Sequence, residues 1–195
     1  MSTPEHDALI HRILGDNYLP LKVVRIAIDE KVEDGSSVKL VVAERDTEVE
    51  CEGKGVGVVD AMWSGLLARY APEYESLKTL RVSKFHVAAD IETKKGTAGL
   101  DAVGRVTFDV TNSEGRHFVF TDASRSVTAS TARAVLAVVQ YFVNAERAFL
   151  TLHNARRDAL ARGREDLVAR YTAEMAEVVE STSYAAVIEN IRKEL

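Results

Sequence analysis

The sequence has a single cysteine, Cys51, which excludes an internal disulfide and is typical of proteins from reducing compartments. No apolar run reaches the length needed to span a membrane. The first ten residues, MSTPEHDALI, lack the basic region and apolar run of a signal peptide. We therefore expect a cytoplasmic protein without a membrane partner, in which Cys51 is a buried structural thiol.

An excess of positive charge is also missing. The net charge of −5 argues against a nucleic-acid partner, because phosphate binding needs a basic surface. The five histidines are scattered and show no metal-ligand spacing with Cys51, so the sequence predicts neither a metal site nor a cofactor. The apolar content of 46% over 195 residues is that of a globular protein with a core.

Strand-like and helix-like patterns follow one another in an order that occurs twice. The expected elements are three strands and a helix at 21–30, 38–44, 47–53 and 58–71, then again at 80–90, 102–110, 116–122 and from about 126. A three-stranded unit with one helix buries little surface alone, so the two units should pack together. The predicted fold class is α+β, with two β-β-β-α units packed as a pseudo-repeat and an added C-terminal helical tail.

The chain divides on this pattern into three parts. A helical segment at 1–19 precedes the repeat at 20–154, and a helical extension at 155–195 follows it. The long helix at 126–152 is apolar on more than one face, so another unit, the tail or a second subunit must cover part of it.

Residues 53–61, GKGVGVVDA, place three glycines at alternate positions directly before the first long helix. A dinucleotide loop needs G-x-G-x-x-G, and a phosphate loop needs G-K followed by Ser or Thr, so the sequence fits neither. Glycine backbone can approach a ligand closely, and a helix N-terminus favours a carboxylate. The structural alternative is a tight turn in which Asp60 complements the helix dipole, with Ser126 as a plain N-cap.

Three motifs occur in the order and rough spacing of a known regulatory domain. They are GVGVVDA at 55–61, GTAGLDAVGRVTFDV at 96–110 and SRSVTASTARAVLAVVQ at 124–140. Over about residues 20 to 150 the chain resembles the C-terminal regulatory domain of 2-isopropylmalate synthase and citramalate synthase. The resemblance implies two β-β-β-α units, a homodimer, and an end-product amino acid, leucine or isoleucine, bound at the dimer interface. The effector-binding residues predicted from the motifs are Gly55, Gly57, Val59, Asp60, Ala61, Asp101 and Ser126.

The chain also departs from that family. Val58 replaces the usual proline, Gly99 and Leu100 precede Asp101, and nothing corresponds to the synthase's catalytic (β/α)8 barrel. The chain is therefore not expected to be an enzyme. The predicted function is a dimeric regulatory or sensor module that binds a small effector, such as a branched-chain amino acid, and acts on a partner such as a separate catalytic synthase. The alternatives are an interaction or dimerisation module without effector binding, and a small acid/base enzyme that uses Asp60 or Asp101.

Overall fold

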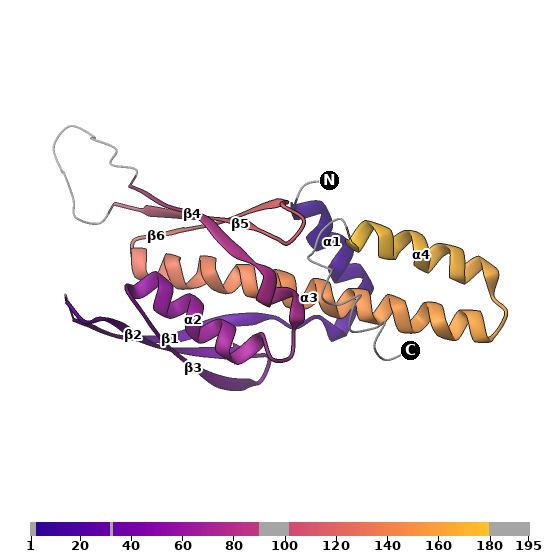
Figure 1. The fold of residues 1–195 in the computed structure, drawn as a ribbon, viewed down its shortest axis with the longest axis horizontal. Helices are drawn as coiled ribbons and strands as arrows, with labels where there is room; N and C mark the ends of the chain where they lie inside the picture. The colour runs from indigo at the N-terminus through magenta and orange to yellow at the C-terminus, as the bar shows by residue number, and fades with distance from the viewer. Residues whose placement is uncertain (1–2, 32, 90–101, 180–195) are drawn as a thin grey trace.

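The computed structural model describes residues 3–31, 33–89 and 102–179. Within these residues the fold contains two three-stranded antiparallel sheets and four α-helices, which confirms the α+β class (Figure 1). Asp101 and residues 180–195 of the predicted extension lie outside the described residues.

The two β-β-β-α units follow the predicted order. The first unit is β1 (Leu21–Lys31), β2 (Gly35–Glu44), β3 (Thr47–Gly55) and α2 (Val58–Tyr70). The second is β4 (Arg81–Ala89), β5 (Gly104–Thr111), β6 (His117–Ser124) and α3 (Val127–Ala161). The 3-10 helix η2 (Glu75–Thr79) connects them, α1 (Thr3–Leu14) and the short η1 (Gly15–Asn17) precede them, and α4 (Glu165–Val179) follows. We call β1-β2-β3 sheet A and β4-β5-β6 sheet B.

Local irregularities repeat along with the elements. The first strand of each unit carries a register shift near its start, between Val23 and Arg25 in β1 and between Val82 and Lys84 in β4. Each third strand leads through a short turn into a helix, whose N-caps are Gly57 and Ser126. The two units are therefore a pseudo-repeat in backbone detail as well as in element order.

Helix α3 lies between the two sheets and forms the centre of the core (Figure 1). It packs on β5 and β6 of sheet B, on β1 of sheet A and on α2, while α2 packs on β2 and β3. This explains why α3 is apolar on more than one face. Its fully buried side chains include Val135, Val138, Val139, Phe142 and Val143.

The second half of α3 extends beyond the sheets and pairs with α1 and α4 (Figure 1). It runs without a break through residue 155, so the described part of the helical extension consists of the last turns of α3 followed by α4. Among the described helices, α3 has the length and apolar composition that could cross a membrane, but 72% of its most apolar window is buried in the fold.

Candidate functional site

The glycines before α2 are positioned by helix packing. A Cβ added at Gly53 would lie 2.7 Å from the Cα of Gly65 and closer still to the backbone of Ala61. A Cβ at Gly55 would lie 2.5 Å from the Oδ2 of Asp60 and 2.6 Å from the N of Ala61. Both glycines therefore allow the first turns of α2 to approach the end of β3, which is a sufficient reason for glycine at these positions.

Asp60 closes the same turn. Its Oδ2 accepts a hydrogen bond of 3.1 Å from the backbone N–H of Val56, and the carboxylate sits in the first turn of α2, where the helix dipole stabilises negative charge. The N–H of Ala61 already donates to the carbonyl of Gly57 at 2.9 Å. Part of the predicted anion site is thus occupied by the protein's own carboxylate.

Gly57 differs from the other two glycines of the segment. Its φ of −158° is extended backbone, and a Cβ added there would have no neighbour within 4 Å. A side chain at this position would point into open space at the start of α2. Val59 lies half-buried two residues further along.

Ser126 is the N-cap of α3, as the structural alternative predicts. Its hydroxyl accepts a hydrogen bond of 3.2 Å from the N–H of Ala129. Below it, the guanidinium of Arg133 donates to the carboxylate of Asp122, with a shortest distance of 2.7 Å. These hydrogen bonds hold the pKa of the Asp122 carboxyl below its usual range.

Those predicted site residues that the structure describes fall at one end of the molecule. Figure 1 shows α2 and α3 beginning at the same end, which places Gly55, Gly57 and Asp60 at the start of one helix and Ser126 at the start of the other. In the part of the chain that the structure describes, no group of three His, Cys, Asp or Glu side chains could hold a metal ion.

Cys51 lies on β3 under α2 and is 2% exposed. Burial raises the pKa of its thiol to about 11, so the thiol stays protonated and unreactive at neutral pH. This agrees with the prediction of a structural thiol.

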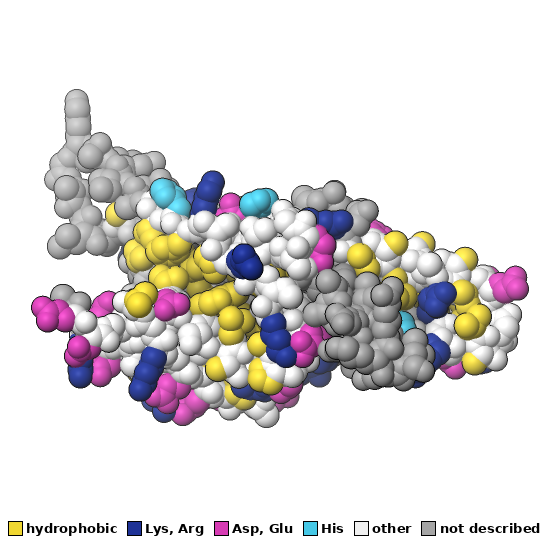
Figure 2. Space-filling view, in the orientation of Figure 1, with side chains coloured by type: hydrophobic (Ala, Val, Ile, Leu, Met, Phe, Trp, Pro, Cys, Tyr) yellow, Lys and Arg dark blue, Asp and Glu magenta, His cyan; other side chains and the backbone are white. Residues whose placement is uncertain are grey.

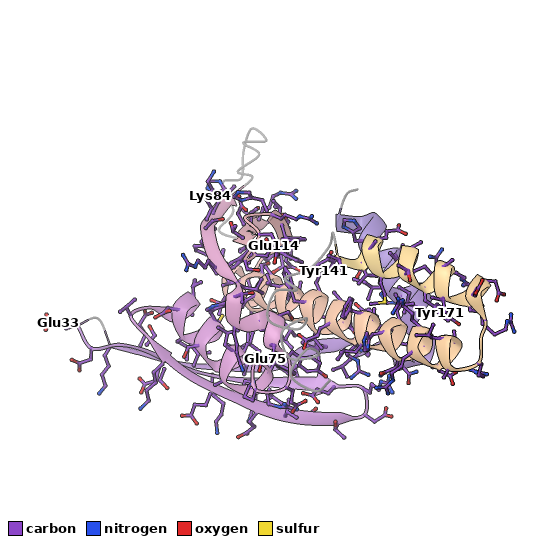
Figure 3. The ribbon with its side chains drawn as sticks, turned by 45° about the vertical axis from the view of Figure 1, so that its right-hand side comes forward. Glu33, Glu75, Lys84, Glu114, Tyr141 and Tyr171 are labelled. Carbon is purple, nitrogen blue, oxygen red and sulfur yellow. The ribbon has the colours of Figure 1, made fainter. Side chains whose placement is uncertain are left out.

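An apolar surface on β4 is a feature that the motifs did not indicate. Val82, Phe85 and Val87 pair with residues of β5 that are fully buried, so they share the side of sheet B that faces the helices. The ring of Phe85 lies 5.0 Å from that of Phe108. Yet the three side chains remain 37%, 42% and 40% exposed, because α3 covers β5 and β6 and does not extend over β4. Lys84, labelled in Figure 3, points the other way, away from the helices.

Helix α2 contributes a second apolar surface. Ala61 and Gly65 face β3, as the close approach to Gly53 shows, and helical spacing therefore puts Trp63 on the opposite side of α2, away from sheet A. Val59 and Leu67 share that side, and all three are only partly buried. Figure 2 shows hydrophobic side chains gathered between β4 and α2. We call this surface the β4–α2 face; it comprises Val82, Phe85, Val87, Val59, Trp63 and Leu67.

No model of a known protein family and no curated protein matches this chain. The resemblance to the synthase regulatory domain therefore stays a prediction from its three motifs. Function is inferred from the geometry of the chain itself.

Proposed function

We propose that the chain is a non-catalytic dimerisation module that associates with a second copy through the β4–α2 face. The exposure of three large apolar side chains on the inner side of β4 carries this proposal. Contiguous exposed apolar surface rimmed by polar residues is typical of an interaction site. Helices contact all three strands of sheet A, although Ile28 at the far end of β1 stays 39% exposed opposite the buried Val38, whereas in sheet B a helix packs on only β5 and β6.

A second copy fits this face because one subunit carries both halves of the contact. The inner side of β4 needs an apolar helix surface, and the side of α2 bearing Trp63 is an apolar helix surface without a sheet of its own. A two-fold axis that sets α2 of one copy against β4 of the other makes both contacts at once. Each subunit then covers the strand that its partner leaves open.

Light scattering combined with size-exclusion chromatography tests this assembly. We expect wild-type protein to be a dimer at tens of micromolar and Val87→Asp to be a monomer, because a charge in an apolar interface should weaken association at least about a hundredfold. Leu160→Asp is the matched control, since Leu160 is 62% exposed but lies at the far end of α3. A monomeric wild type, or equal effects of the two variants, would overturn the proposal.

Trp63 supplies an independent readout, because it is the single tryptophan of the chain. Its emission should shift to longer wavelength when dilution separates the subunits and exposes the indole. The Val87→Asp variant should show the shifted emission at every concentration, with an unchanged circular dichroism spectrum. An emission maximum that is independent of concentration while the mass changes would place the interface elsewhere.

Effector binding is the second candidate function. It is favoured by the common location of the α2 and α3 starts, whose first N–H groups have no intrahelical acceptor and suit a carboxylate. A thermal-shift screen against amino acids and 2-keto acids tests it, since a ligand at a hundred times its Kd stabilises a fold by about 2.7 kcal/mol. A Cβ at Gly57 has no neighbour within 4 Å, so a Gly57→Phe substitution should leave the apo protein folded. The added ring should block the site and abolish the thermal shift. An unchanged ligand response in this variant would reject the site.

A further inference from the structure

A cavity of about 360 Å³ lies at the opposite edge of sheet B from β4. Its described lining comes from β6, from the middle of α3 and from α1. Tyr141, labelled in Figure 3, lies on α3 between sheet B and the α1–α4 pair. The volume falls within the range of pockets that hold small organic molecules.

The cavity has an apolar interior. Tyr141 and Phe120 are almost fully buried, and their rings meet edge to face with centroids 5.7 Å apart. Ala137 adds a small aliphatic side chain, whereas Val119, which pairs with Asp109 and so lies on the outer side of sheet B, is 53% exposed and reaches only the rim. A compact hydrocarbon group would replace water against this wall, with two aromatic rings beneath it.

The polar side chains in the described lining are neutral or negatively charged. Gln140 is fixed by the fold, since its Oε1 accepts from the N–H of Leu21 at 2.6 Å and its Nε2 donates to the hydroxyl of Tyr18 at 3.2 Å. Asp7 is the single charged residue in the described lining, where no lysine or arginine accompanies it; its carboxylate lies 3.8 Å from the Nε2 of the exposed His11. Burial, and after it the negative charge of Asp7, raises the pKa of Tyr18, next to Gln140, to about 12.

We propose that this cavity binds small organic amines, with the ammonium group on Asp7 and a compact hydrocarbon body against Ala137, Phe120 and Tyr141. The carboxylate supplies the anionic partner for the ammonium, and the exposed edges of the two buried rings add apolar contact. A free amino acid fits less well, because its own carboxylate would lie near Asp7 with no lysine or arginine in the described lining to pair with. The site is separate from the β4–α2 face and does not depend on dimerisation.

Three ligands of one shape separate the contributions to binding. Isopentylamine has the ammonium and the hydrocarbon body, leucine adds a carboxylate, and 4-methylpentanoate has the carboxylate without the ammonium. We expect isothermal titration to show binding of isopentylamine, at least about tenfold weaker binding of leucine, and none of 4-methylpentanoate. Equal affinity for the amine and leucine, or no binding of the amine at millimolar concentration, would overturn the proposal.

Two variants locate the site. Asp7→Asn should weaken isopentylamine binding by about tenfold or more, because a hydrogen bond to a charged group is lost. Asp16→Asn is the matched control, since Asp16 is an exposed acid outside the lining. Ala137→Leu should abolish binding by filling the cavity while Asp7 stays in place. Amine binding that survives both Asp7→Asn and Ala137→Leu would refute the site.

Discussion

Replacing Gly53 with alanine tests whether the glycines before α2 serve packing or a ligand. The added methyl group would lie 2.7 Å from the Cα of Gly65, where ordinary contact begins at about 3.4 Å. The atoms that it meets belong to the backbone of α2, which cannot rotate away as a side chain can. Helix α2 must therefore move off β3.

The cost follows from what α2 buries. Met62 and Leu66 are fully buried on this helix, and Tyr70 is nearly so; each loses packing when the helix is displaced. Forcing one extra methyl group into a packed core costs about 1–3 kcal/mol, and a rigid backbone neighbour puts this site at the upper end. We expect Gly53→Ala to lower the free energy of unfolding by about 3 kcal/mol.

Urea denaturation followed by circular dichroism measures this change. With an m value near 2 kcal/mol/M, the midpoint should fall by roughly 1.5 M. Protein concentration must be held fixed, because the proposed dimerisation would stabilise the fold by mass action. Gly57→Ala is the control: with extended φ and no neighbour within 4 Å, it should stay within about 1 kcal/mol of wild type. A Gly53→Ala midpoint equal to that of the wild type would refute the packing explanation. Ligand binding would then be the remaining explanation for glycine at this position.

Three further substitutions test local interactions. Ser126→Ala removes the N-cap of α3 and should cost about 1 kcal/mol, or roughly 2–4 °C in Tm by calorimetry. Asp122→Asn should destabilise at pH 7, because Arg133 lowers the pKa of Asp122 in the folded state; urea midpoints should converge with wild type as pH falls below about 4, where the unfolded-state carboxyl protonates. Glu146→Ala leaves two N–H groups of η2 without the buried carboxylate that accepts from them and should cost about 2–3 kcal/mol in urea titrations, with partial rescue by glutamine.

The order of elements could be predicted from sequence because each strand alternates and each helix keeps its spacing. Even the start of α3 followed from Ser126, since a serine before an apolar run is an N-cap signal that acts through local geometry. The strand ends differ from the predicted ones by three residues at most: β2 begins at Gly35 instead of 38, and β5 begins at Gly104 instead of 102. Local sequence preferences are thus enough to predict the order of the strands and helices.

The role of the glycines could not be predicted in the same way. Gly53 and Gly55 permit a close backbone approach, and a sequence pattern does not say whether a helix or a ligand makes that approach. The open side of β4 has a similar origin. Val82, Phe85 and Val87 mark a strand with one apolar side, but which side of a sheet lacks a helix depends on contacts between distant parts of the chain. A pattern within one segment of the sequence therefore cannot show which side of the sheet is left without a helix.

The difference in length between the two repeat helices explains why the open surface lies at β4. Helix α2 has 13 residues and covers sheet A alone, whereas α3 has 35 residues and contacts both sheets. In an even repeat, α2 would reach β4 as α3 reaches β1. The added helices do not fill this space, because α1 and α4 pack along the second half of α3, where they bury Leu9, Ile10, Leu14 and Val178. They complete the end of α3 that extends beyond the sheets within one subunit. Among the described elements, β4 and the outer side of α2 thus keep exposed apolar side chains, and this is the surface that the proposed dimer would bury.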